Sequence, residues 1–365
     1  MGLQALLGGF SVAMASRFLA AACHVSPVML SGAKTTEKCI SLISQAAKNS
    51  ANLVVFPESY IPAFPFWSAI QAPIRNHVYF ERMAKESIYV DGEEMLAIRD
   101  TAKQTGTVVS VGISEKVRYS TATMFNSNII IGSDGEILVH HRKLMPTFFE
   151  KLTWSPGDGY GLRVANTRFG KIGALICGEN TNPLARYAMM AQGEQVHISS
   201  WPAVWPTTIQ QGTDQGVDRP AYRNAVANQT RAAAHSFENK CFGILCAGYL
   251  DEASIDAICS LAEEPILMRV VLATALRAAT AFVDPTGTKI LGHTIDPTSG
   301  EKSYQRDLCE KEGILYAELD LDKCVEGKQY HDVVGGYQRL DVFDLKVDRT
   351  RRKPATFLKK PRVGP

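Results

Sequence analysis

The sequence predicts a single layered α/β domain whose β-sheets are mixed. Short apolar runs typical of buried strands alternate with segments in which apolar residues recur at helical spacing. A turn signal at Ser133-Asp134-Gly135 joins two of the strands directly, which indicates antiparallel pairs beside the parallel ones that strand–helix–strand units produce. The 365 residues contain no internal repeat, low-complexity tract or clear linker before the C-terminal tail, so we expect one domain flanked by two ends.

The N-terminal half alternates strands with helices and then forms a hairpin. A helix is expected from about Thr36, because Ile40, Ile43 and Ala47 follow at helical spacing, and a second helix is expected over 92–104. Strands are expected over 18–23, 52–56, 107–112, 124–131 and 136–141.

The C-terminal half continues the alternation. Asn182 is a good N-cap, Pro183 suits the first helical position and Gly193 is a good stop signal, so a helix is expected between them. A long helix is expected over 222–237, and residues 284–287 form a turn signal. Strands are expected over 171–176, 196–199, 242–246, 280–283 and 314–319.

The composition is that of an ordinary globular protein. Lys and Arg number 39 against 37 Asp and Glu, a net charge of +2, and 45% of residues are hydrophobic, which excludes wholesale disorder and argues against a broad nucleic-acid-binding surface. No apolar stretch approaches the ~20 residues of a membrane span, so no membrane partner is expected. Eight cysteines without a CxxC pair indicate reduced thiols and a cytoplasmic location.

The two ends differ from the body of the chain. Residues 346–365 contain eight Lys/Arg and one Asp, a charge of +7, which leaves 31 minus 36, or −5, for the remainder. This basic tail is predicted to be a flexible, solvated arm, with binding to a membrane surface or nucleic acid as the alternative. Residues 1–17 are interpreted as an N-terminal extension of the domain at 18–345. Ala13-Met14-Ala15 resembles a signal-peptidase site, but no positive segment precedes it, and secretion is kept as the alternative.

Three chemically capable side chains each follow a predicted strand, and the carboxyl ends of strands are where α/β sites assemble. Cys177 precedes a helix whose N-terminus would favour a nucleophilic thiolate, although most free cysteines are buried hydrophobes. Glu58 follows an apolar strand and suits base chemistry, with an ordinary loop glutamate as the alternative. Lys143 would stabilise developing negative charge, or would simply end a strand.

Neither a metal nor an organic cofactor is expected. His140 and His141 are adjacent, but on a strand they point to opposite faces, and no HExxH or Cys/His cluster accompanies them. Phe64 and Trp201 are selected as substrate-binding residues, although core packing explains aromatic residues equally well. The wider set of aromatic candidates for the substrate wall is Phe64, Phe66, Trp67, Trp154, Trp201 and Trp205.

These residues lie in three ordered motifs that resemble those of the nitrilase superfamily of carbon–nitrogen hydrolases. Similarity extends from about Phe18 to about Val342, and the order glutamate, lysine, cysteine makes the match specific. The Gly178-Glu179-Asn180 form looks most like the fungal-type arylacetonitrilases. The motifs read VVFPESYIPAFPFW, HRKLMPTFFEKLTWSPGDG and GALICGENTNPLARYAMMAQGEQVHISSWP.

The resemblance implies a role for each residue. Cys177 corresponds to the nucleophile, Glu58 to the general base and Lys143 to the group that stabilises the tetrahedral intermediate. Glu150 matches an additional glutamate that supports the site. The implied fold is a four-layer α-β-β-α sandwich. The implied assembly is a homo-oligomer of dimers that extend into spirals or filaments.

The chain departs from the superfamily pattern at two places. Gly178 stands where tryptophan is frequent, which enlarges the space beside the cysteine. Residues 251–280 fit the pattern less well, and this puts that part of the implied assembly surface in question.

The implied activity is hydrolysis of an organic nitrile, of arylacetonitrile type, to a carboxylic acid and ammonia through thioimidate and thioester intermediates. A cyanide hydratase or an amidase with the same three residues is the first alternative. A non-catalytic, filament-forming scaffold is the second.

Overall fold

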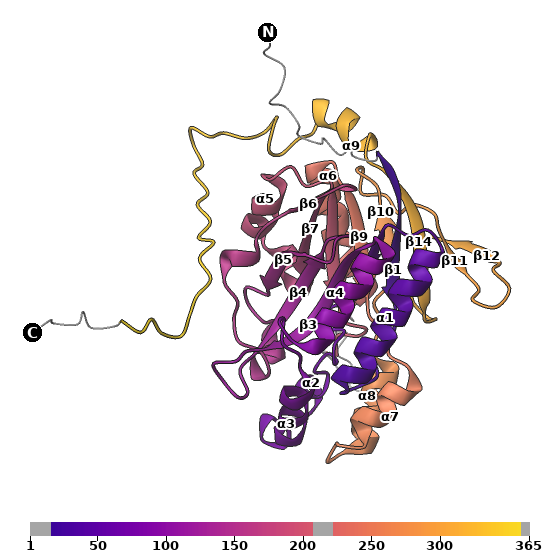
Figure 1. Ribbon diagram of the computed structural model, residues 1–365, viewed down its shortest axis with the longest axis vertical. Helices are drawn as coiled ribbons and strands as arrows, with labels where there is room; N and C mark the ends of the chain where they lie inside the picture. Colours follow the sequence, from indigo (N-terminus) through magenta and orange to yellow (C-terminus); the bar gives the residue numbers. More distant parts are fainter. Residues whose placement is uncertain (1–15, 207–221, 359–365) are drawn as a thin grey trace, which may run out of the picture.

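A computed structural model describes residues 16–206 and 222–358. Two β-sheets pack face to face and helices cover their outer surfaces, which gives the predicted four-layer α-β-β-α sandwich in a single domain (Figure 1). Of the predicted extension at 1–17, only Ser16 and Arg17 are among the described residues.

The first sheet has eight strands in the order β12-β11-β14-β1-β2-β3-β4-β5. Strands β1, β2 and β3 are parallel, whereas β4 pairs antiparallel with β3. The predicted hairpin then pairs β5 antiparallel with β4. Its strands are β1 (Arg17–His24), β2 (Leu53–Val55), β3 (Val108–Lys116), β4 (Met124–Ile131), β5 (Ile137–Arg142), β11 (Gly292–Ile295), β12 (Lys302–Gln305) and β14 (Gly313–Asp320).

The second sheet has six strands in the order β13-β10-β9-β8-β7-β6. Its centre is parallel, because β7 pairs with β8 and β8 with β9 in the same direction. Its strands are β6 (Ala165–Thr167), β7 (Gly170–Ile176), β8 (Val196–Trp201), β9 (Phe242–Ala247), β10 (Thr280–Val283) and β13 (Asp307–Leu308).

The alternation of side chains along β1 shows how the layers form. Ala20 and Ala22 face the second sheet and belong to the core between the two sheets. Ala21 and Cys23 face outward and belong to the core beneath the covering helices. All four are buried, since an inner strand of this sandwich has an apolar layer on each side.

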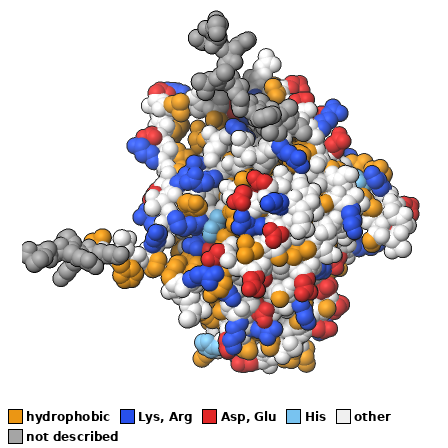
Figure 2. Space-filling model, viewed as in Figure 1, with side chains coloured by type: hydrophobic (Ala, Val, Ile, Leu, Met, Phe, Trp, Pro, Cys, Tyr) orange, Lys and Arg blue, Asp and Glu red, His pale blue; other side chains and the backbone are white. Residues whose placement is uncertain are grey.

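Four helices cover the two sheets. Helices α1 (Gly32–Lys48) and α4 (Glu93–Thr105) supply Cys39, Ile43 and Ile98 to the core of the first sheet. Helices α5 (Pro183–Met190) and α6 (Asn224–Asn239) belong to the second sheet. Figure 2 shows cationic and anionic side chains mingled over the face that carries α1 and α4.

The start of α5 agrees with the sequence signals, whereas the start of α1 differs from them. At the start of α5 the Asn182 side chain accepts hydrogen bonds from the backbone N–H groups of Leu184 and Ala185, as its N-cap position predicts. Helix α1 begins earlier than predicted, at Gly32, whose N–H donates to Glu86 Oε2 at 2.9 Å. That cap comes from a residue 54 positions away, so the local pattern does not contain it.

The segment over 251–280 contains two helices that the sequence analysis did not predict. Helices α7 and α8 pack against each other and bury apolar side chains such as Ile258 and Met268 in a cluster with Trp67 and Tyr79. Ile266 of α8 remains 81% exposed. The α-helices not yet given bounds are α2 (Trp67–Ile70), α3 (His77–Glu86), α7 (Glu252–Cys259), α8 (Pro265–Thr274) and α9 (Lys323–Glu326).

The described part of the C-terminal tail is not a freely solvated arm. Arg351 forms an ion pair with Asp158 at 3.1 Å and donates to the backbone carbonyl of His140 at 3.0 Å. The backbone of Asp348 lies so close to Gly159 that a Cβ there would meet its carbonyl oxygen at 2.2 Å. The prediction of a flexible arm is therefore wrong for this stretch, which runs extended down the left side of Figure 1.

The described helices include none that is both long and apolar enough to cross a membrane.

Candidate active site

The carboxyl ends of β2, β5 and β7 bring the predicted site residues together. Glu58 lies three residues after β2, whereas Lys143 and Cys177 directly follow β5 and β7. The Cys177 Sγ atom and carboxylate oxygens of Glu58 and Glu150 all lie within 4.8 Å of one another. All four side chains are buried, so they form one compact polar group inside an apolar fold.

Lys143 lies between two carboxylates. Its Nζ donates to Glu58 Oε1 at 2.8 Å and to Glu150 Oε2 at 2.6 Å. Burial by itself lowers the pKa of Lys143, but its anionic neighbours outweigh this effect and hold the pKa well above its usual value. Burial raises the pKa of Glu150 to about 7, although Lys143 opposes the change. The ammonium is therefore permanently charged and occupies the place that a metal cation would take among these carboxylates.

Cys177 is held as a thiol in a strained conformation. Its φ of 50° is in the left-handed region, and it begins the short 3₁₀ helix Cys177–Thr181. Burial raises the pKa of the thiol well above its ordinary value, and Glu58 adds to the increase while Lys143 opposes it. Any preference for the thiolate from the following helix N-terminus has to act against this burial. The thiol needs a base, and within the described residues Glu58 Oε2 makes no hydrogen bond that would occupy it.

Two polar side chains that the sequence analysis missed hold this group in place. The side-chain amide of Asn126 on β4 donates to Glu58 Oε1 at 2.7 Å. The backbone carbonyl of Asn126 accepts from the backbone N–H of Lys143 at 2.7 Å. Glu179 accepts from the backbone N–H groups of Leu144 at 2.6 Å and Ile176 at 2.8 Å, which ties the end of β5 to the end of β7. Both are positioning residues, because each fixes one catalytic candidate relative to another.

A buried network supports the Cys177 turn from behind. The Asn180 side chain donates to the carbonyls of Leu175 at 3.1 Å and Cys177 at 3.0 Å. His197 Nε2 donates to Asn180 Oδ1 at 2.9 Å, and His197 Nδ1 donates to Glu194 Oε1 at 2.8 Å. His197 therefore links Glu194 to the side chain that holds the Cys177 turn.

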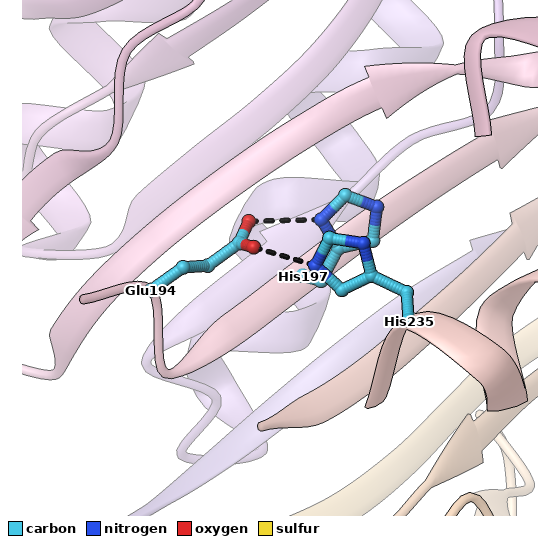
Figure 3. A group of neighbouring side chains, drawn as sticks. All are labelled: Glu194, His197 and His235. Carbon is cyan, nitrogen blue, oxygen red and sulfur yellow. Dashed lines mark hydrogen bonds and ion pairs between the residues drawn. The ribbon is translucent and has the colours of Figure 1, made fainter. Parts of the chain in front are cut away.

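The remaining member of this network is His235 on α6. Its Nε2 donates to the second oxygen of Glu194 at 2.7 Å, and its ring stacks on His197 with 3.6 Å between centroids and 18° between planes. Figure 3 shows each carboxylate oxygen of Glu194 facing one imidazole ring. A metal ion shared by His197 and His235 would need a nitrogen lone pair from each ring to point at one position. The rings are nearly parallel and stacked, so their lone pairs point in similar directions instead of converging. The geometry therefore fits a hydrogen-bonded network better than a metal site.

This network predicts a loss of stability in mild acid. Burial and the charge of His197 lower the pKa of His235 to about 4. Burial raises the pKa of Glu194, but the two histidines outweigh it and lower the value to about 2. Both folded-state pKa values are depressed, so the unfolded chain binds protons first. The free energy of unfolding should fall as pH decreases from 6.5 toward 4 through His235, and from 4.5 toward 2 through Glu194, by on the order of 3 kcal/mol for each group.

Urea unfolding at pH 7, 5.5 and 4.5 would measure this decrease. His235→Gln should flatten the dependence between pH 6.5 and 4.5, whereas His77→Gln, at an exposed histidine, should leave it unchanged. Equal stability of the unmodified protein at pH 7 and 4.5 would contradict the assignment.

Cys177 opens into a cavity of about 340 Å³. Trp201, which the sequence analysis selected as a substrate-binding residue, lines it together with Trp205. Phe64 does not line it. Its ring packs among other aromatic rings and borders a separate cavity of about 20 Å³ beside Glu58, so the expectation that Phe64 walls the substrate space is wrong for this cavity. Among the described residues, the cavity of about 340 Å³ is lined by Thr147, Cys177, Gly178, Thr181, Trp201, Pro202, Trp205, Tyr222, Asn224, Asn228 and Arg231.

Gly178 leaves room beside the cysteine. A Cβ at this position would meet Thr147 Oγ1 at 2.7 Å, and the Thr147 N–H in turn donates to Glu150 Oε2 at 3.0 Å. A larger residue would therefore narrow the cavity and also disturb Glu150.

Comparison with known proteins shows the family of this chain. The family model for carbon–nitrogen hydrolases matches residues 19–329. The chain belongs to the carbon–nitrogen hydrolase family. This hydrolase is 32% identical over 329 residues to an arylacetonitrilase of Hypocrea virens, covering 89% of this chain and 90% of the relative. It is also 32% identical over 352 residues to a nitrilase of Penicillium rubens, covering 94% and 97%.

A solved structure shares the fold of this hydrolase. A carbon–nitrogen hydrolase from Helicobacter pylori superposes with a TM-score of 0.63 at 21% identity, covering 89% of this chain and 96% of that one. The family match and the two relatives above make the protein a carbon–nitrogen hydrolase of the nitrilase type.

Proposed function

We propose that this enzyme hydrolyses an organic nitrile of arylacetonitrile type to the carboxylic acid and ammonia. The observation that carries the proposal is a buried thiol that lies within 4.8 Å of two carboxylates sharing one lysine and that lines a cavity together with two tryptophans. The names of the two relatives, arylacetonitrilase and nitrilase, support it.

The first half of the reaction forms the covalent intermediate. Glu58 removes the proton of the Cys177 thiol, and the sulfur attacks the nitrile carbon. The nitrile nitrogen takes up this proton from Glu58 as the C≡N bond becomes C=N, which gives a thioimidate and restores the Glu58 carboxylate. Lys143 stays protonated between its two carboxylates and stabilises the negative charge that develops on this nitrogen.

The second half releases the products. Glu58 takes a proton from water, and the hydroxide adds to the thioimidate carbon to give a tetrahedral species. Proton transfer to nitrogen allows ammonia to leave, so a thioester remains. A second water molecule then breaks the carbon–sulfur bond, and the carboxylic acid departs as the thiol is restored. If the carbon–sulfur bond breaks before ammonia leaves, the amide is released instead.

A panel of nitriles tests the proposal. Purified enzyme should release ammonia and phenylacetate from phenylacetonitrile, with phenylacetamide as a minor product. Cyanide and phenylacetamide serve as parallel substrates, because the same residues suit a cyanide hydratase or an amidase. Faster turnover of either would identify that alternative. Neither ammonia nor an amide product from any of the three would favour a non-catalytic scaffold and would refute the proposed activity.

We also propose that the enzyme is cytoplasmic and forms a homo-oligomer of dimers that extend into spirals or filaments. The eight free cysteines support a reducing compartment. Exposed apolar side chains on α8, including Ile266 and Val270, support a contact between copies. Sedimentation at several concentrations tests the assembly, and a monomer throughout would refute it.

A further inference from the structure

Helix α6 turns a polar face toward the cavity that holds Cys177. Asn224, Asn228 and Arg231 are spaced i, i+4 and i+7, so they lie on one side of the helix, and all three line the cavity. The lining also includes the apolar side chains of Trp205 and Pro202. The reaction described above uses none of these three polar side chains.

Two of these side chains are buried with unmade hydrogen bonds. Asn228 is 1% exposed, and neither its Nδ2 nor its Oδ1 has a partner among the described residues. Asn224 is 3% exposed, and its Nδ2 likewise has none there. Leaving a buried donor unsatisfied is costly, so a ligand that accepts hydrogen bonds from this wall gains binding free energy.

Arg231 adds a positive charge to the same wall. Its guanidinium lies over the Trp201 ring, 4.8 Å from the centroid, and contacts the hydroxyl of Tyr222. Within residues 16–206 and 222–358 no carboxylate forms an ion pair with it, whereas Lys143 has two. The indole N–H of Trp201 is also buried without a partner in this part of the chain. The wall therefore presents several N–H donors and one cation.

We propose that Asn224, Asn228 and Arg231 form a carboxylate-binding subsite, and that the preferred substrates are cyanocarboxylates, in which a carboxylate lies on the part of the molecule away from the nitrile. This proposal rests on the proposed nitrile hydrolysis and names its substrate class. A guanidinium fork matches the two oxygens of a carboxylate, and the asparagine amides supply further donors. A neutral arylacetonitrile leaves these donors without a hydrogen-bond acceptor, and a cationic nitrile is repelled by the charge of Arg231.

The test compares two nitriles of similar size that differ in charge: para-(cyanomethyl)benzoate and para-methylphenylacetonitrile. For the unmodified enzyme, kcat/KM for the carboxylate should exceed that for the methyl compound at least tenfold. In Arg231→Gln this ratio should fall at least tenfold, and Arg231→Lys should give an intermediate ratio, because a lysine keeps the charge but not the fork. Arg223→Gln removes an arginine from the exposed start of α6, outside the cavity lining, and should keep the original ratio.

A ratio at or below one in the unmodified enzyme, or a ratio that Arg231→Gln leaves unchanged, would overturn the subsite. If neither nitrile is hydrolysed, the proposed activity fails, and binding alone decides the subsite. Calorimetric titration of Cys177→Ala with the same two nitriles would then be used, because only one of them carries a carboxylate. Tighter binding of para-(cyanomethyl)benzoate supports the subsite if Arg231→Gln weakens it at least tenfold, and equal binding of the two nitriles refutes it.

Discussion

Replacing Cys177 with alanine is expected to abolish nitrile turnover while the fold stays intact. No other group of the described site provides a nucleophile, so kcat should fall by at least about 10⁴-fold. The thiol is small and its backbone turn is held by Asn180, so the free energy of unfolding should change little. Ammonia release from phenylacetonitrile measures the activity, and urea unfolding measures the stability.

Cys241→Ala is the matched control for this variant. Cys241 is also fully buried, but it lies at the start of β9, away from the cavity lining. It should lose some stability through a small void and should keep its activity. Turnover by Cys177→Ala above the background of the assay would refute the nucleophile assignment.

Replacing Lys143 is expected to affect both activity and stability. In Lys143→Met, the carboxylates of Glu58 and Glu150 are left buried without their shared cation, which costs on the order of 3–5 kcal/mol of folding free energy. The developing charge also loses its stabilising group, so kcat should fall by roughly 10²–10³-fold. Lys143→Arg should be slow as well, because a planar guanidinium does not fit the place of a compact ammonium.

A second variant separates the two effects. Adding Glu150→Gln to Lys143→Met removes one of the two unpaired carboxylates and should restore part of the stability, as a double-mutant cycle in urea would show. The same change should restore none of the activity. Near-normal kcat for Lys143→Arg, or a stability of Lys143→Met equal to that of the unmodified protein, would contradict the role of Lys143.

Much of the fold could be predicted because its signals are local. Strands such as β7 are continuous apolar runs, and the start of α5 has its cap within three residues. Helices α7 and α8 were missed although both have local start signals, the Asp251 cap and Pro265 in the first turn, and only their burial in the cluster with Trp67 and Tyr79 depends on distant segments. The C-terminal tail was misjudged because the partners of Arg351 lie at Asp158 and His140.

The sequence by itself determined the order of glutamate, lysine and cysteine and their positions at strand ends, because these are properties of short segments. It also determined the family. Only the tertiary structure decided that Cys177 is a buried thiol, that Phe64 lies outside the cavity and that α6 supplies a polar wall. The hydrogen bond between Asn126 and Glu58 spans 68 residues, and that between Leu144 and Glu179 spans 35. Burial and contacts of this kind arise only when the sheets pack, so no local pattern contains them.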